Sequence, residues 1–102
     1  MSLETRSIVE PLAAEAIRLG ADQLDVEYKA GYEEVFAVKS GVGQEITRFR
    51  SSSPEAASLR DELHSLTKRK RRMVVNDSTY ELRGRVYDSF GEDAFCVDWR
   101  RV

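Results

Sequence analysis

Hydrophobic positions along the chain follow a helical period in two segments and a period of two elsewhere. Apolar residues at helical spacing predict one helix from near Pro11 to Gly20 and a second from Ser53 to about Arg69. The second start is well marked, because Ser53 is a good N-cap and the proline after it suits the first helical position. Residues 1–10 are expected to be frayed or extended, although Ser7 and Glu10 have the spacing of a capping box.

Alternating apolar and polar residues predict two groups of three strands. The first group lies between the helices at 24–28, 34–39 and 46–49, and the second follows at 73–75, 80–87 and 94–99. Short turns between the strands favour antiparallel neighbours. The order α-β-β-β-α-β-β-β therefore predicts an α+β fold over residues 1–102, with two helices against one face of an antiparallel sheet.

Composition narrows the class of protein. The 102 residues are 41% hydrophobic and 33% charged, and no apolar run is long enough to cross a bilayer, so we expect no membrane insertion. One cysteine and one histidine exclude a disulfide within the chain and a His/Cys metal cluster. We therefore expect a cytoplasmic domain without a metal or another cofactor.

The net charge of −2 hides an uneven distribution. The first 47 residues carry nine acidic and four basic side chains, whereas residues 48–72 carry eight basic and three acidic ones. Five of the basic side chains are consecutive: Lys68, Arg69, Lys70, Arg71 and Arg72. Such a run can contact phosphates, or it can complement the negative C-terminal end of the second helix.

Other polar residues favour structural roles over chemistry. His64 lacks a nucleophilic partner in the sequence, and Cys96 stands between two apolar residues, so we expect a surface or boundary histidine and a packed thiol. The adjacent carboxylates Glu33 and Glu34 are interpreted as solvated charges at a turn. Trp99 is either a binding edge beside two arginines or the core end of the last strand.

Several short strings, in their order and spacing, resemble the N-terminal α+β domain of type II secretion and type IV pilus assembly ATPases. They are residues 19–27 (LGADQLDVE), residues 38–46 (VKSGVGQEI), residues 80–83 (YELR) and Gly91-Glu92. The family's Arg and Asp beside its turn are Val38 and Ser40 here, and residues 72–78 replace its Pro-Gln-Asp-Gly-Arg string. The resemblance implies a bacterial protein whose fold serves protein contacts.

The same resemblance places the family's ATP chemistry in a separate motor domain with a G-x-x-x-x-G-K-[ST] loop, a string that this sequence does not contain. It also implies that Arg83 can reach toward a nucleotide held by such a motor. Residue chemistry alone favours a pair between Arg83 and Glu81 or another acid across the sheet.

Three functions follow from these observations. The leading hypothesis is a non-catalytic protein-interaction or regulatory module with a protein partner. The alternative is a small nucleic-acid-binding protein that uses residues 68–72 with Arg48 and Arg50. An enzyme has the least support, because no acid, base and nucleophile converge. An exposed edge strand also allows a homodimer by strand addition.

Overall fold

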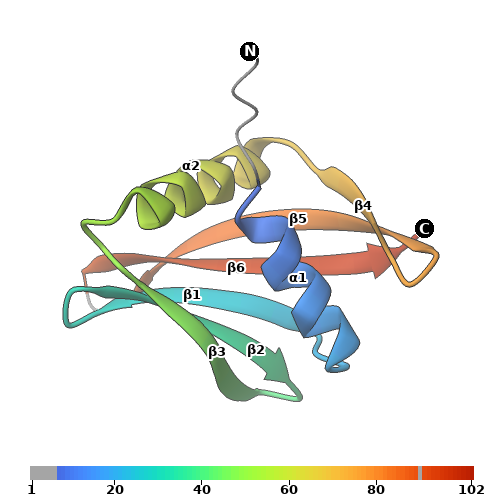
Figure 1. The fold of residues 1–102 in the computed structure, drawn as a ribbon, viewed down its shortest axis with the longest axis horizontal. Coiled ribbons are helices and arrows are strands. Elements are labelled where there is room, and N and C mark those ends of the chain that lie inside the picture. The colour runs from blue at the N-terminus through green and yellow to red at the C-terminus, as the bar shows by residue number, and fades with distance from the viewer. Residues whose placement is uncertain (1–6, 90) are drawn as a thin grey trace.

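A computed structural model describes residues 7–89 and 91–102 of the chain and confirms the predicted α+β fold and its element order (Figure 1). The helices and strands are α1 (Val9–Arg18), β1 (Gln23–Lys29), β2 (Tyr32–Lys39), β3 (Val42–Arg50), α2 (Pro54–Lys68), β4 (Arg71–Val75), β5 (Ser78–Ser89) and β6 (Glu92–Arg101).

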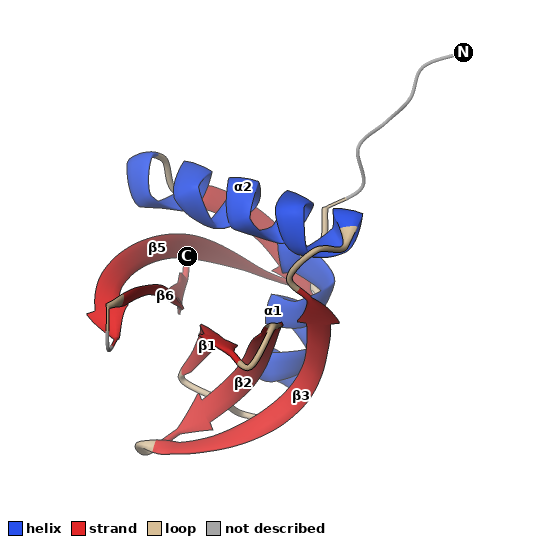
Figure 2. Ribbon diagram, turned by 90° about the vertical axis from the view of Figure 1, so that its left-hand side faces the viewer, coloured by secondary structure: helices blue, strands red, loops and turns tan. Residues whose placement is uncertain are grey.

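All six strands form one antiparallel sheet, in the spatial order β3-β2-β1-β6-β5-β4. Each group of three is a meander, and pairing of β1 with β6 joins the two groups. The sheet is strongly twisted and curved, as Figure 2 shows. Strands β3 and β4 lie at its opposite edges.

Two-residue turns set the register of three hairpins. Their central residues all have positive φ angles, which is typical of the turns that match the right-handed twist of a hairpin. These pairs are Ala30-Gly31, Ser40-Gly41 and Asn76-Asp77. Asp22 supports the second turn, since the Ser40 N–H donates to its Oδ2 at 2.8 Å.

The hydrophobic core lies between the two helices and one face of the sheet, which we call the inner face (Figure 1). Buried inner-face residues lie directly opposite one another across β1, β2 and β6, for example Leu24 beside Val97 and Val26 beside Phe95. Helix α2 adds Leu59, Leu63 and Leu66, and α1 adds Val9, Leu12, Ala13 and Ala16. The remaining face of the sheet, which carries no helix, is called the outer face.

Gly84 lets α2 approach β5 closely. A Cβ atom at this position would lie 2.7 Å from the Leu66 Cβ, which is closer than real contacts allow, and 3.1 Å from the Leu66 carbonyl carbon, which is tighter than most real contacts. The backbone of α2 therefore rests on β5 because this strand position has no side chain.

The first helix begins earlier than predicted. It starts at Val9 rather than near Pro11, and it ends at Arg18, with Gly20 in the left-handed conformation just beyond. Residues 7–10 are not frayed, because the carboxylate of Glu62 holds the backbone there; residues 1–6 lie outside the described part. The second helix begins as predicted, with Ser53 accepting from the Ala56 N–H at 3.1 Å.

A cationic surface on the outer face

The basic run 68–72 is divided between three places. Lys68 is the last residue of α2, and Arg69 caps that helix with its N–H bonded to the Ser65 carbonyl. The chain then enters β4, where successive side chains point to opposite faces of the sheet. Arg71 consequently points to the inner side, whereas Lys70 and Arg72 contact an acid on the outer face. The five charges do not form one patch.

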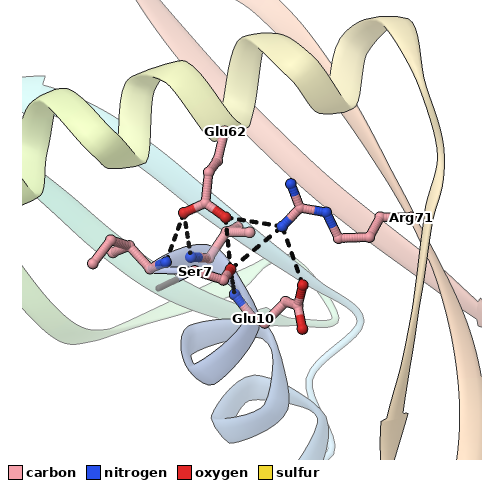
Figure 3. Close-up of polar contacts among 6 residues, drawn as sticks. Ser7, Glu10, Glu62 and Arg71 are labelled. Atoms are coloured by element: carbon pink, nitrogen blue, oxygen red, sulfur yellow. Dashed lines mark hydrogen bonds and ion pairs between the residues drawn. The ribbon is translucent and has the colours of Figure 1, made fainter. Parts of the chain in front are cut away.

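Arg71 belongs to a polar network that joins β4 to both helices (Figure 3). Its Nη1 atom lies 2.8 Å from Glu62 Oε1 on α2, 3.3 Å from Glu10 Oε2 on α1 and 3.3 Å from the Ser7 hydroxyl oxygen. The side chain of Arg71 is partly buried, with 29% of it exposed. Its role is to hold the packing of β4 and the two helices.

Glu62 caps the first turn of α1 from a different helix (Figure 3). It accepts hydrogen bonds from the N–H groups of Ile8 at 2.6 Å and Val9 at 3.1 Å, and from the Ser7 hydroxyl at 2.6 Å. A carboxylate is stabilising at this positive end of a helix. Burial raises the pKa of Glu62, but the hydrogen bonds from Arg71, Ser7 and the two N–H groups outweigh it, so the net pKa lies below its usual range.

Five cations gather on the outer face of β4, β5 and β6. We call this group the cationic surface; its members are Lys70, Arg72, Arg83, Arg85 and Arg100. They surround two carboxylates, so the surface has an excess of three positive charges. The side chains of the cations are 57–71% exposed, whereas those of the two acids are 12% and 23% exposed. Water therefore meets mainly guanidinium and ammonium groups.

Each of the two carboxylates is shared among several cations. Glu81 on β5 accepts from Arg100 on β6 at 3.2 Å and lies 3.7 Å from the Lys70 Nζ and 3.8 Å from the Arg72 Nε. Lys70, Arg83 and Arg100, together with this acid, are among the residues that line an open depression of about 350 Å³. The two longest contacts exceed ordinary hydrogen-bond distance, so these cations keep hydrogen-bonding capacity for another group.

The second carboxylate, Asp98 on β6, accepts from two arginines. Arg83 reaches it through two nitrogens at 3.3 Å each, and Arg85 reaches it at 3.1 Å. The predicted pairing of Arg83 with an acid across the sheet is therefore confirmed. Sequence reasoning missed Arg85 and Arg100 as members of the same surface, although the period of two places Arg85 on the same strand face as Arg83.

Acidic residues border the cationic surface on the β1 side. Asp25 lies opposite Cys96 in the sheet, and the Arg85 Nη2 lies 3.6 Å from the Cys96 Sγ. Burial raises the pKa of Cys96, as does the nearby Asp25, so the group is a protonated thiol. Burial, with Asp25 and Glu27, also raises the pKa of Tyr87 to about 12. Acidic side chains thus replace the cations of the outer face at β1.

Trp99 lies on the inner side of β6, opposite Leu82 and partly buried against the core. This position favours the prediction that Trp99 is the core end of the last strand over the prediction that it is an exposed binding edge.

Arg48 lies on β3, at the sheet edge opposite β4, where it pairs with Glu45 at 3.3 Å and lies over the Tyr32 ring at 5.4 Å. The structure therefore does not bring the β3 arginines beside residues 68–72 within the sheet.

Glu33 is buried, and its interpretation as a solvated turn charge is wrong. The residue is 5% exposed, accepts a hydrogen bond from the Ser51 hydroxyl and lies 3.6 Å from the Arg60 Nη1 on α2. It shares the inner face with Val35, two residues further along β2, so the alternation of the strand already indicated that Glu33 faces the core.

His64 is exposed, and its ring packs edge-on against that of Phe95 with the ring centroids 4.9 Å apart, as expected for a boundary histidine.

Within the described ranges 7–89 and 91–102, no group of three or more His, Cys, Asp or Glu side chains is arranged to hold a metal ion. None of the helices in that part of the chain is long and apolar enough to cross a membrane.

Comparison with solved structures finds the same fold in part of an ATPase. The chain is similar to the ATPase DotB of Legionella pneumophila, with a TM-score of 0.52 and 20% sequence identity, over 100% of this chain and 31% of that one. The chain thus spans about a third of the length of that structure. No family model matches the sequence, and no curated protein matches it either. At this identity the likeness concerns the fold alone.

Proposed function

We propose that the chain is a non-catalytic protein-interaction module, with an adaptor or regulatory role beside a secretion or pilus assembly ATPase. The observation that carries this proposal is that the whole chain matches about a third of an ATPase in fold. The strings that resemble the N-terminal domain of secretion ATPases support it independently, because they follow one another in the family's order.

The disposition of reactive side chains supports a binding role over catalysis. The His64 ring packs on Phe95, which points to the inner face, whereas the next residue, Cys96, points to the outer face. The histidine and the thiol are therefore on opposite sides of β6. The carboxylates of Glu81 and Asp98 are each engaged with cations. None of these groups forms a nucleophile with a neighbouring base.

Cross-linking in the source cells tests the proposal. An affinity-tagged chain is cross-linked in vivo and purified under denaturing conditions, and the captured proteins are identified by mass spectrometry. We expect subunits of a secretion or pilus assembly machine. Capture of no such subunit would overturn the proposal. Purified chain is also expected to hydrolyse ATP no faster than buffer, and turnover above that level would contradict a non-catalytic role.

Nucleic-acid binding is the second candidate, and the excess positive charge of the cationic surface is the observation that favours it. A gel shift at low salt with random DNA and RNA tests it. Binding at protein concentrations of about 10 µM would support this candidate, since non-specific binders reach that range. The absence of a shift at that concentration would remove it.

A further inference from the structure

We infer that the cationic surface binds an acidic, extended segment of a protein partner, which lies along β5 between β4 and β6 with carboxylates at alternate positions. The inference deepens the proposed function and rests on it in one respect, namely that the partner is a protein.

The spacing of the cations suits an extended peptide. Arg83 and Arg85 are two residues apart on one strand face, which places their Cα atoms about 7 Å apart. Arg72 and Arg100 flank Glu81 on the two neighbouring strands, so their backbones are about 10 Å apart. Alternate side chains of an extended segment also repeat at about 7 Å. A segment that runs along β5 with acids at alternate positions therefore places successive carboxylates beside Arg83 and Arg85, with Arg72 and Arg100 on the strands to either side.

The existing ion pairs leave these cations available. The acids are outnumbered, and the contacts of Glu81 with Lys70 and Arg72 are 3.7 and 3.8 Å long between exposed cations and a shared carboxylate. Such exposed pairs contribute little to stability, so they can rearrange at small cost. Arginine also presents a planar fork that binds a carboxylate through two parallel hydrogen bonds.

The borders of the surface favour a short acidic segment over a nucleic acid. Asp25 lies on β1 beside the surface, opposite Cys96, and Glu27 follows it on the same face of that strand. Duplex DNA carries a phosphate charge for about every 1.7 Å of its axis, so a long polyanion would continue over these acids. A protein segment places its charges only where cations meet them.

An exposed apolar residue beside the cations adds to the chemistry of the partner. Val74 is 65% exposed and lies two residues beyond Arg72 on the outer face of the edge strand β4. A bound segment can cover this side chain with an apolar residue next to its acids. Together, the charges and Val74 favour a protein ligand, which can combine both kinds of contact.

Fluorescence anisotropy with defined peptides tests the inference. The probes are a labelled ten-residue peptide with Glu at alternate positions, the matched Gln peptide, and a labelled random duplex DNA, all at low salt. The test variant is Arg83→Gln/Arg100→Gln. The control variant, Arg48→Gln/Arg50→Gln, removes the same charge from β3, outside the cationic surface. Thermal melts of both variants check that they fold.

We expect the Glu peptide to bind and the Gln peptide not to bind. Affinity for the Glu peptide should fall about fivefold or more in the test variant and change less than about twofold in the control, because only the test variant removes cations of the surface. Equal losses in both variants would overturn the inference. It would also be overturned if the Glu peptide failed to bind at about 1 mM, or if the DNA bound and the peptide did not.

The two proposals fail in different experiments. Absence of peptide binding removes the docking surface, but it leaves any secretion subunit captured by cross-linking in place. Conversely, cross-linking that recovers no secretion subunit removes the proposed assembly, whereas selective loss of peptide binding in the test variant still establishes an acid-binding surface.

Discussion

Arg71 and Arg72 are neighbours of the same charge, yet mutation of each should affect a different property of the protein. The change Arg71→Gln removes a partly buried guanidinium that bridges Glu62 and Glu10. The change Arg72→Gln removes a guanidinium that is 68% exposed and lies 3.8 Å from its acid. We expect the first to destabilise the fold, and the second to spare the fold while weakening peptide binding.

The magnitude follows from the contacts. A hydrogen bond between charged groups contributes about 1.5–3 kcal/mol, and the partial exposure of Arg71 reduces this to about 1–2 kcal/mol for its bond to Glu62. In a domain of this size, Arg71→Gln should lower Tm by about 4–10 °C. An exposed pair contributes about 0–0.5 kcal/mol, so Arg72→Gln should change Tm by less than about 3 °C.

Thermal and urea melts followed by circular dichroism measure both effects. A double-mutant cycle with Glu62→Gln isolates the pair, and its coupling energy should be about 1 kcal/mol. Coincident melting curves for Arg71→Gln and Arg72→Gln would refute the assignment of the two arginines to different roles.

Three further outcomes can be measured on the purified chain. Gly84→Ala should lower the free energy of unfolding, measured by urea melt, by about 1–2 kcal/mol, because the new methyl group would clash with Leu66. The control Gly43→Ala meets only ordinary contacts and should change it by less than about 0.5 kcal/mol. Equal effects would argue against close packing of α2 on β5. Because the pKa of Glu62 is lowered in the folded chain, its ionised carboxylate stabilises the fold above about pH 4.5, and this stabilisation is lost as the pH falls through the pKa of the folded state. Glu62→Gln should therefore lose less stability than wild type on acidification below pH 4.5, and parallel losses would contradict this. Burial and a raised pKa should make the Cys96 thiol react with maleimide much more slowly in the folded than in the urea-unfolded chain.

Local signals were sufficient to predict the elements of this fold. The Ser53-Pro54 start of α2, the glycine after α1 and the alternation of Leu24 and Val26 are short-range features that the structure confirms. The start of α1 has a local signal in Ser7, whose hydroxyl accepts from the Glu10 N–H at 3.1 Å, although Pro11 favours a later start. The N–H groups of Ile8 and Val9 are instead capped by Glu62, 53 residues away from Val9 in the sequence, and a cap from another element leaves no local signature.

The candidate site was harder to predict, because a sheet assembles it. The run 68–72 suggested one patch in the sequence, but strand alternation sends Arg71 inward and Arg72 outward. Arg83 and Arg100 join the surface only through the pairing of β5 with β6. Cross-strand neighbours separated by many residues depend on register, which the sequence alone does not specify here.

The most direct test of the docking surface is a titration of ¹⁵N-labelled chain with the unlabelled Glu peptide, followed by amide chemical shifts. We expect the largest shifts in β4, β5 and the second half of β6, around Arg72, Arg83 and Arg100, with the amide shifts of β3 unchanged. Shifts centred on β3 or on the helices, with the β5 amides unmoved, would contradict this expectation.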